Sequence, residues 1–450
     1  MIFNKLNKSI VVSILLLFII VPTQLRAQNS SERFRLTVKP VNYPELKGLQ
    51  SYIYAQWGDE VLILGGRLDG LHRRQPFASF DADFNNRNIW LINLHTKKTI
   101  SQPINTLSTA LQEQLESSNM QCYQKDSLLI VTGGYGYSKT KDEHVTYPYL
   151  TIIQIPQLIQ AIHQKQNINA CFSQIKDERM AITGGRMHLL EDSVFYLVGG
   201  HRFDGSYNPM GPDHGPGFTQ QYSNSIRRFT LQQIQAQYLI QMKSIWYDSL
   251  NLHRRDMNVL PFIDSFGATA LTLFSGVFQY DADIPYHTLV DIRPSGYHLI
   301  KGFEQRYNQY QTASFTLFDS STYSNYSVFF GGIGHYYMQN KKLIKDNDVP
   351  FTKHISVVQR NKDGRLKEYL LPNEMPGYLG ASAEFLPANL SLLHTSGVLM
   401  LNRITDFNQP IGYIIGGIQS TKRNIFWDNE GELSKASPVI FEVFLSMSRK

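Results

Sequence analysis

The stretch Val194-Phe-Tyr-Leu-Val-Gly199-Gly200, an apolar β-rich run closed by two glycines, recurs along the chain and decides the fold. Equivalent runs end at Gly65-Gly66, Gly133-Gly134, Gly331-Gly332 and Gly416-Gly417, and a degraded one ends at Ser275-Gly276. The runs lie roughly 55 to 85 residues apart, a spacing typical of a repeated structural unit. Six similar β units predict a closed ring of small sheets.

Each repeat is predicted to contain four strands, of which the second carries the glycine pair. The fourth repeat shows this order as residues 255–260, 267–275, 286–293 and 296–302. The other predicted third strands are residues 88–94, 149–155, 225–231, 354–359 and 439–445. These segments are short and rich in β-branched or aromatic residues, as strands are. Two helices are predicted between strands, at residues 107–115 and 156–164.

The last repeat lacks a fourth strand, because the sequence stops soon after residue 445. Arg33-Phe-Arg-Leu-Thr-Val-Lys39 alternates apolar and polar or charged residues, the pattern of an outer strand with one exposed face. We expect this segment to be the fourth strand of the sixth blade. The pairing would join the two ends of the chain and remove the free edges of the sheet.

The paired glycines suit strand ends near a crowded central channel, where a Cβ atom has little room and φ is positive. The pattern resembles the kelch (galactose-oxidase-like) family of β-propellers, whose third strands often carry an aromatic residue, as Trp90 and Phe229 do here. The resemblance covers residues 33–446 and implies an all-β, six-bladed kelch-like β-propeller, its ring closed by an N-terminal strand. A regular Tyr-to-Trp spacing is missing from the blades.

The first 27 residues have the pattern of a secretory signal peptide. Lys5 and Lys8 precede an apolar stretch from Ile10 to Val21, and small residues end the segment at Ala27. The stretch is shorter than the roughly 20 residues that cross a bilayer, so no transmembrane segment is expected. Residues 28–450 are expected to form one kelch-like β-propeller domain, exported to the periplasm, the cell surface or the medium.

Charge argues against nucleic acid as a partner. Removal of residues 1–27 leaves 40 basic and 37 acidic residues, a formal charge of +3 in place of +6. A nearly balanced chain without basic runs lacks the electrostatic footprint of nucleic-acid binding.

Cys122 and Cys171 are the two cysteines of the chain. They are assigned to an innermost and an outermost strand of one blade. Strands lie about 4.8 Å apart, so three strand spacings exceed the reach of a disulfide. Two free thiols are therefore predicted.

Candidate ligand-binding residues come from the loops between second and third strands and from the connections between blades, which emerge on one face. The predicted set is Arg73, Arg74, His201, Arg202, His253, Arg254, Arg255, Tyr280, His335 and Tyr336. Arginine binds carboxylate, sulfate or phosphate through paired hydrogen bonds, and tyrosine stacks on sugar rings. The alternative is that the arginines hold long loops by pairing with acids such as Asp69, Asp204 and Asp256.

No metal or other cofactor is predicted. Asp81, Asp83 and Asn85 have the spacing of oxygen ligands, but Asn86 and Ile92 stand where a calcium loop has glycine and glutamate. The kelch resemblance also implies copper-radical oxidases, which use tyrosines, histidines and a cysteine. The matching dyads Tyr286-His287 and Tyr297-His298 are better explained as alternating sheet residues.

The sequence favours a ligand-binding or protein-binding module with a monomeric state. Its glycan or protein partner is unidentified, and anionic glycans are among the ligands that we expect. The alternative is a carbohydrate-active enzyme resembling the sialic-acid mutarotase type of kelch propeller. A pocket that gathers His72, His201 and His253 within hydrogen-bonding reach would favour the enzyme. A channel with scattered arginines would favour binding.

Overall fold

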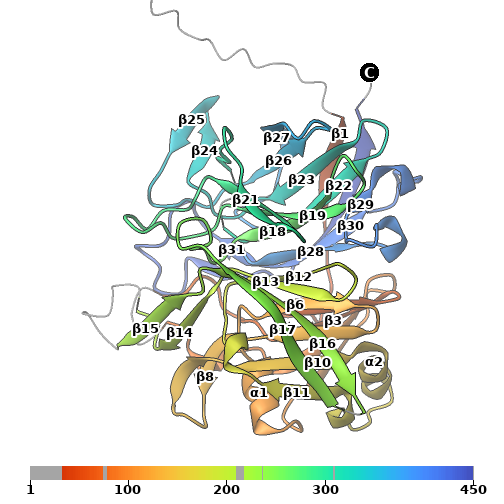
Figure 1. Ribbon diagram of the computed structural model, residues 1–450, viewed down its shortest axis with the longest axis vertical. Helices are drawn as coiled ribbons and strands as arrows, with labels where there is room; N and C mark the ends of the chain where they lie inside the picture. The colour runs from red at the N-terminus through yellow and green to blue at the C-terminus, as the bar shows by residue number, and fades with distance from the viewer. Residues whose placement is uncertain (1–32, 74–78, 209–216, 236, 308–309, 449–450) are drawn as a thin grey trace, which may run out of the picture.

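The chain folds as a six-bladed β-propeller (Figure 1). The computed structural model describes residues 33–73, 79–208, 217–235, 237–307 and 310–448. The predicted signal peptide lies outside these residues. Among the described residues, no helix is long and apolar enough to cross a membrane.

The blades are numbered in chain order, and the strands of each are given from the channel outward. Blade one contains β2 (Ile53–Trp57), β3 (Glu60–Leu64), β4 (Asn88–Asn93) and β5 (Thr99–Pro103). Blade two contains β6 (Gln121–Lys125), β7 (Leu128–Thr132), β10 (Tyr149–Gln154) and β11 (Phe172–Lys176). Blade three contains β12 (Arg186–Leu190), β13 (Val194–Val198), β16 (Ser225–Ile234) and β17 (Gln237–Tyr247).

The other three blades follow the same order. Blade four contains β18 (Asn258–Ile263), β19 (Thr269–Phe274), β20 (Leu289–Arg293) and β21 (Gly296–Leu299). Blade five contains β22 (Ser314–Asp319), β23 (Ser324–Phe330), β26 (His354–Arg360) and β27 (Leu366–Glu374), with β29 (Leu399–Met400) parallel to β22. Blade six contains β28 (Ala383–Pro387), β30 (Gly412–Gly416), β33 (Ile440–Met447) and β1 (Phe34–Val41).

The glycine pairs stand where the second strands end, as predicted. Both residues of each pair have positive φ, which in the glycines ranges from 55° at Gly331 to 97° at Gly134, and Ser275 takes the same conformation at 50°. The crowding is real: an added Cβ on Gly199 would lie 2.7 Å from the carbonyl oxygen of Arg254. The chain therefore leaves each second strand by a turn that side chains disfavour.

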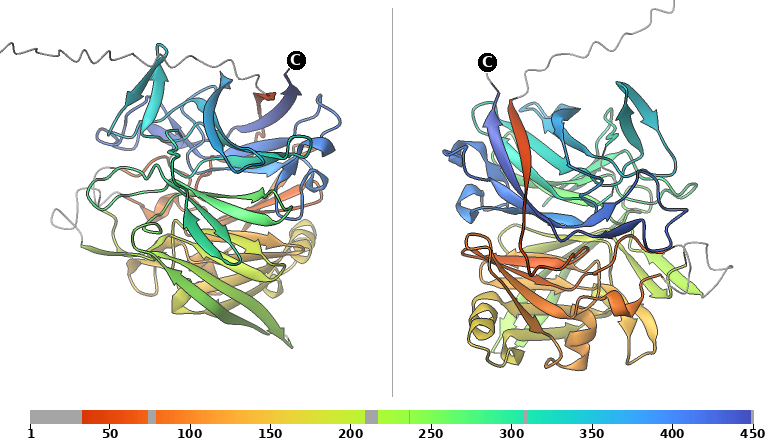
Figure 2. Two further views of the ribbon diagram at one scale, coloured as in Figure 1. Left: turned by 45° about the horizontal axis from the view of Figure 1, so that its top comes forward. Right: turned by 180° about the vertical axis from the view of Figure 1, so that it is seen from behind.

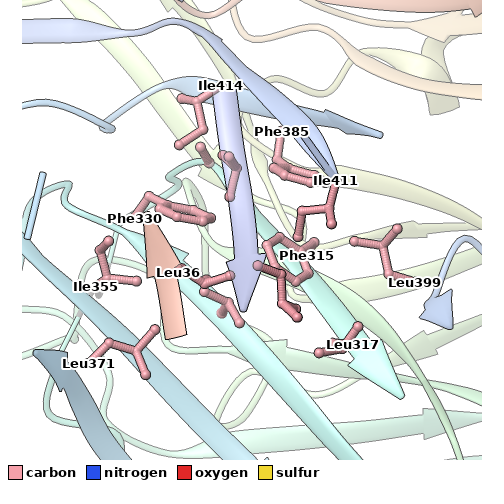
Figure 3. Packing of buried hydrophobic residues seen from close by; sticks show 14 of the residues in the cluster. Leu36, Phe315, Leu317, Phe330, Ile355, Leu371, Phe385, Leu399, Ile411 and Ile414 are labelled. Atoms are coloured by element: carbon pink, nitrogen blue, oxygen red, sulfur yellow. The ribbon is translucent and has the colours of Figure 1, made fainter. Parts of the chain in front are cut away.

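The N-terminal strand closes the ring, which confirms the prediction. Strand β1 pairs antiparallel with β33 from Phe34 opposite Met447 to Val41 opposite Ile440. Figure 2 shows the two strands side by side in its right-hand view. Phe34 and Leu36 of β1 are buried in the core cluster between blades five and six, while Arg35 is exposed. Figure 3 shows Leu36 with other side chains of this cluster.

Four two-stranded hairpins, which the sequence reading left as loops, follow glycine pairs. They are β8 (Tyr135–Ser138) with β9 (Glu143–Thr146), β14 (His201–Gly205) with β15 (Phe218–Tyr222), β24 (Tyr336–Gln339) with β25 (Lys342–Lys345), and β31 (Ile418–Ser420) with β32 (Ser434–Ala436). The third strand of blade four begins at Leu289, three residues later than predicted. Residues 286–288 instead belong to the loop that leads into it.

Two α-helices lie between strands, close to the predicted ranges. Helix α1 (Thr109–Leu115) connects blades one and two, and α2 (Ile155–His163) connects the last two strands of blade two, with proline in its first turn. Short 3-10 helices occur at η2 (Ala82–Phe84), η3 (Asn169–Cys171), η4 (Glu178–Met180), η6 (Leu390–Leu392) and η7 (Leu401–Arg403). Both α-helices bury apolar side chains against the blades, so they belong to the packed body.

The two cysteines lie as the register predicts. Cys122 is on β6, the innermost strand of blade two, and Cys171 immediately precedes β11, the outermost one. Both thiols are free. Burial raises the pKa of Cys122 to about 12, which keeps this thiol protonated and unreactive.

An ion pair crosses the central channel. Arg186 on the innermost strand of blade three lies 3.0 Å from the carboxylate of Glu384 on the innermost strand of blade six, the opposite blade. The amide of Gln311 donates to the same carboxylate oxygen at 3.0 Å. Three blades are thus connected through the axis of the ring.

The ring closure predicts that Leu36→Ala lowers the free energy of unfolding by about 3 kcal/mol, because a fully buried leucine leaves a cavity. Arg35→Ala on the exposed face of the same strand is the control and is expected to change it by no more than about 0.5 kcal/mol. Urea unfolding measures both. Equal effects would contradict the role of β1 in the core.

The crowding at the glycine pairs predicts a difference between two glycines of equal φ. Gly199 and Gly58 both have φ of 59°, but an added Cβ at Gly58 meets no atom within 4 Å. Gly58→Ala is expected to lower the free energy of unfolding by about 1 kcal/mol through backbone strain. Gly199→Ala is expected to lower it by at least about 2 kcal/mol more. Thermal unfolding of the two variants tests this, and similar melting temperatures would refute it.

Candidate functional site

The glycine-pair ends of the second strands face the side of the propeller that carries the inserted hairpins. We call this surface the mouth: the loops after the glycine pairs together with the connections between blades. Neighbouring hairpins bond to each other here. The Thr146 hydroxyl donates to the carbonyl of Phe203 at 2.7 Å, and the Tyr135 hydroxyl donates to the carbonyl of Gly205 at 2.7 Å. These bonds join the insertions of blades two and three into one wall.

Arg255, on the connection into blade four, is held from two sides. Its Nε donates to the Tyr222 hydroxyl at 3.3 Å, and its Nη1 pairs with the carboxylate of Asp256. The guanidinium carbon lies 4.9 Å from the centre of the Phe278 ring. The side chain is only 14% exposed, and its Nη2 donates to no side chain or carbonyl among the described residues. One donor of a fixed cation is therefore free.

The charge of Arg255 is secure. Burial lowers its pKa, but the phenol of Tyr222 and the carboxylate of Asp256 raise it more, so the pKa lies above the usual arginine value. Asp256 occupies one side of the guanidinium, which agrees with the alternative prediction that arginines of these loops pair with nearby acids. The cation is thus retained in a partly dry site where hydrogen bonds to it are strong.

Tyr222, which sequence reasoning missed, connects three predicted residues. Its ring stacks on His253 with centroids 3.8 Å apart, and His253 stacks on Tyr280 at 3.9 Å. The three rings come from β15, the connection into blade four and the loop after β19. His253 Nδ1 lies 2.9 Å from the side-chain oxygen of Asn224, which orients the middle ring. Tyr280 ends the stack with 57% of its surface exposed.

His201 lies beside this stack. It faces Tyr222 across the β14–β15 hairpin, with ring centroids 5.7 Å apart. Burial, followed by the charge of Arg255, holds the pKa of His201 well below its usual range, so the ring is neutral. The Gln220 amide nitrogen lies 2.8 Å from Nδ1, which therefore accepts, and the ring proton is on Nε2.

A second aromatic wall comes from blades one to three. His72 contacts Tyr207, with ring centroids 4.8 Å apart, and Phe80 lies 5.6 Å from the same tyrosine ring. The Tyr207 backbone N–H donates to the hydroxyl of Tyr135 at 3.1 Å. Burial, together with the smaller effects of the charges of Arg255 and Arg67, lowers the pKa of His72 to about 4, although the hydrogen bond to the Arg73 carbonyl opposes this shift. The wall is therefore uncharged at neutral pH.

Arg254 does not reach the mouth, and in this respect the predicted ligand contact is wrong. Its side chain is fully buried and donates to the carbonyls of Asn251, Ser275 and Thr288 at 2.6 to 2.8 Å, and to the Thr288 hydroxyl. Burial lowers its pKa to about 10. These bonds tie the entry to blade four to the end of its second strand, so Arg254 belongs to the scaffold.

Two other arginines of these loops, Arg202 of the predicted set and Arg67 outside it, pair with acidic residues. Arg202 pairs with Asp204 at 2.7 Å and with Glu178 at 2.9 Å, so its guanidinium is engaged by two carboxylates. Arg67 pairs with Asp69 at 2.7 Å and holds the first loop of blade one. The guanidinium of Arg73 lies 5.8 Å from the ring centre of Phe84, and Arg74 lies outside the described residues.

His335 and Tyr336 form a separate group between blades four and five. His335 is fully buried and lies 2.9 Å from His287, measured between Nδ1 and Nε2. The ring of Tyr336 lies 5.4 Å from that of His287. The structure thus brings together His201, His253, Arg255 and Tyr280 at Tyr222, and places His335 and Tyr336 in another sector.

The residues weighed for metals have local roles. Asp81 caps η2 by accepting from the Asp83 backbone N–H, and Asn85 accepts from Arg67 at 3.1 Å. Tyr297 and His298 lie on β21. In the part of the chain that the structure describes, no three histidine, cysteine or acidic side chains are placed to hold a metal ion.

Two grooves lie on the face opposite the mouth. One is lined by Asp59, His95, Arg403 and Tyr413, and the other by Ser265, Thr322, Asn361 and Arg365. Both form at the turns where second strands begin. The fixed cation and the ring stack are therefore elsewhere, and we place the candidate site at the mouth on its chemistry.

The residues that sequence reasoning missed are Tyr222, Gln220 and Tyr310. Tyr222 and Gln220 approach His201 only because β15 returns beside β14, and the loop between these strands gave no hairpin signal. Tyr310 lies near enough to Arg255 for that charge to affect its pKa, which burial raises well above the usual range. Its hydroxyl is buried and makes no hydrogen bond within the described ranges.

The sequence and the fold were also compared with known proteins. No protein-family model matches the chain, and no curated protein sequence does. The chain is similar in shape to a solved structure titled "Structure of YjhT", with 11% sequence identity over 90% of this chain and 99% of that chain, and a TM-score of 0.48. At that identity and score the likeness carries no argument about function.

The burial of His72 predicts a stability that depends on pH. An unfolded histidine binds a proton near pH 6.5, while folded His72 has a pKa of about 4, so protonation favours unfolding as pH falls between these values. Between pH 7.5 and pH 5, the free energy of unfolding is expected to fall by about 2 kcal/mol less in His72→Gln than in the unaltered protein. Urea unfolding at both pH values measures this.

The control is His298→Gln, because the side chain of His298 is 60% exposed. This variant is expected to follow the unaltered protein at both pH values. The same loss of stability in His72→Gln as in the control would show that His72 is not the titrating group.

Proposed function

We propose that this propeller is an exported binding module whose mouth takes a small anionic carbohydrate, with Arg255 as the anchor for its carboxylate. The observation that supports this most is the free Nη2 of a guanidinium fixed by Tyr222 and Asp256. A held arginine loses little conformational entropy when it binds, so its remaining donor is preorganised.

Other donors lie around this one. The neutral ring of His201 carries its proton on Nε2, and the buried hydroxyl of Tyr310 has no partner among the described residues. A buried polar group without a partner costs free energy that a ligand or a water molecule recovers. Together with Nη2 of Arg255, these make three donor groups, which suits a ligand rich in oxygen acceptors.

The ring stack suits the carbohydrate part of such a ligand. Tyr222, His253 and Tyr280 form one column, and the exposed outer ring is Tyr280. Aromatic rings with one free face pack against the apolar face of a sugar ring, and the column behind Tyr280 keeps it in place. The Tyr280 hydroxyl donates to the carbonyl of Ser249 at 2.8 Å, which fixes the ring further.

A carbohydrate-active enzyme remains the second candidate, and the histidines of the mouth favour it less. His72, His201 and His253 bond to three different partners: the Arg73 carbonyl, the Gln220 amide and the Asn224 side chain. Among the described residues, no hydrogen bond joins two of these three histidines. Binding therefore has the stronger support at this site.

Isothermal calorimetry with D-glucuronate, and with D-glucose as the neutral match, tests the proposal. Glucuronate is expected to bind and glucose to bind at least about tenfold more weakly, since a charge-assisted bond contributes about 1.5 to 3 kcal/mol. Arg255→Lys keeps the charge but loses the planar fork, and is expected to weaken glucuronate binding about tenfold.

Arg202→Lys is the matched control, because Arg202 lies on β14 at the same face and its guanidinium is engaged by two carboxylates, those of Glu178 and Asp204. It is expected to leave the affinity unchanged. Equal affinity for glucose and glucuronate would overturn the proposal. Absence of binding by glucuronate, galacturonate and N-acetylneuraminate would overturn it as well, in favour of a protein partner.

A further inference from the structure

The histidine pair between blades four and five forms a chain of hydrogen bonds with a defined direction. His287 lies in the mouth loop of blade four, two residues before β20, and His335 precedes the β24–β25 hairpin of blade five. Nε2 of His335 lies 2.8 Å from the side-chain oxygen of Asn347, and its Nδ1 lies 2.9 Å from Nε2 of His287. Three side chains from two blades are thus aligned.

The direction of these hydrogen bonds follows from which atoms can donate a proton. The amide oxygen of Asn347 only accepts, so Nε2 of His335 carries a proton. Burial lowers the pKa of His335, so its ring is neutral and its Nδ1 has a lone pair. Nε2 of His287 must then donate to that lone pair. The neutral ring of His287 therefore has its own lone pair on Nδ1.

That lone pair is available. Nδ1 of His287 has no hydrogen-bond partner among the described residues, and the side chain is only half-buried. Lys345 and Arg306 lie close enough for their charges to lower the pKa of His287, and Glu304 acts in the opposite direction. A neutral base with positively charged groups within electrostatic range suits a reaction in which negative charge develops on an oxygen atom.

We propose that His287 is the general base of a hydrolytic site for carboxylic esters between blades four and five, with His335 and Asn347 as positioning residues. The arrangement has the logic of a base held by a second group, which is in turn held by a third. This site does not rest on the anionic-carbohydrate proposal, because Arg255 and the ring stack take no part in it.

The step is balanced as a water-dependent cleavage. Nδ1 of His287 takes a proton from a water molecule, and the water oxygen forms a bond with the ester carbonyl carbon. The positive charges of Lys345 and Arg306 stabilise the resulting oxyanion. The bond between the carbonyl carbon and the alkoxy oxygen then breaks, and the protonated His287 returns its proton to the leaving oxygen. The products are a carboxylic acid and an alcohol.

Hydrolysis of p-nitrophenyl acetate by the purified protein tests the proposal, with release of p-nitrophenol as the readout. His287→Gln is expected to lower the rate at least about tenfold. His298→Gln is the matched control: it also follows a tyrosine, but it lies 60% exposed on β21. The proposal fails if the unaltered protein is no faster than His287→Gln, or if His298→Gln loses as much activity.

The pH dependence separates His287 from an ordinary surface imidazole. Burial, followed by the charge of His335, lowers the pKa of His287 to about 4; Lys345 and Arg306 act in the same direction against Glu304, and Tyr336 faces the ring edge. The base is active when unprotonated, so the rate is expected to persist at pH 5.5 and to decline only near pH 4. A decline centred near pH 6.5 would contradict the assignment.

Variants of Asn347 test the positioning role of this residue without a change to His287. Asn347→Asp keeps an oxygen acceptor for His335 and is expected to retain activity, while Asn347→Leu removes it and is expected to reduce the rate and change its pH profile. Equal rates in the two variants would overturn the positioning role. His287→Gln is expected to bind glucuronate normally and Arg255→Lys to hydrolyse the ester normally, so failure of one proposal is distinguishable from failure of the other.

Discussion

Space for a Cβ atom is missing where the second strand of each blade ends, and the position of the mouth depends on this constraint. The chain passes these points with positive φ at two successive residues, even at Ser275 of blade four. This turn directs the following residues out of the blade instead of into an immediate return strand. The inserted hairpins, the histidine pair and the two tyrosines of the ring stack all follow such turns. The steric demand of the scaffold therefore determines which side of the molecule carries its chemistry.

The interior of the ring also affects the environment of the mouth. Arg186 and Glu384 meet across the axis from opposite blades, and Gln311 adds a third contact. A partly buried pair of this kind is costly to break from one side, because the remaining charge loses its partner. The pair thus connects opposite blades inside the channel. The mouth has a polar floor beneath it, while its walls at His72 and Tyr207 are aromatic and uncharged.

The parts of the fold that follow from local rules were predictable from the sequence. The glycine pairs mark strand ends by their own conformational needs, and the alternation in residues 33–39 marks an outer strand that pairs with β33. Arg254 and Arg255 show where such reasoning ends. The two residues are identical neighbours, yet one is buried against main-chain carbonyls and the other lies at the mouth. Which neighbour faces inward depends on the packing of blades three and four, and no local pattern contains that information. The pairing of His201 with Tyr222 is hidden for the same reason, since it needs the return of β15.

The closure by β1 and β33 also has a kinetic consequence. The partners that meet in this sheet, such as Phe34 and Met447, are nearly the whole described chain apart, so the loop that must close is as long as the ring itself. Loop-closure entropy and high contact order make such pairing slow, and until it happens the edge of β33 stays open to other strands. The ring therefore cannot be completed in the order in which the chain is made. Its last step unites the earliest and latest strands, and the interval before that step is when the protein is most exposed to misassembly.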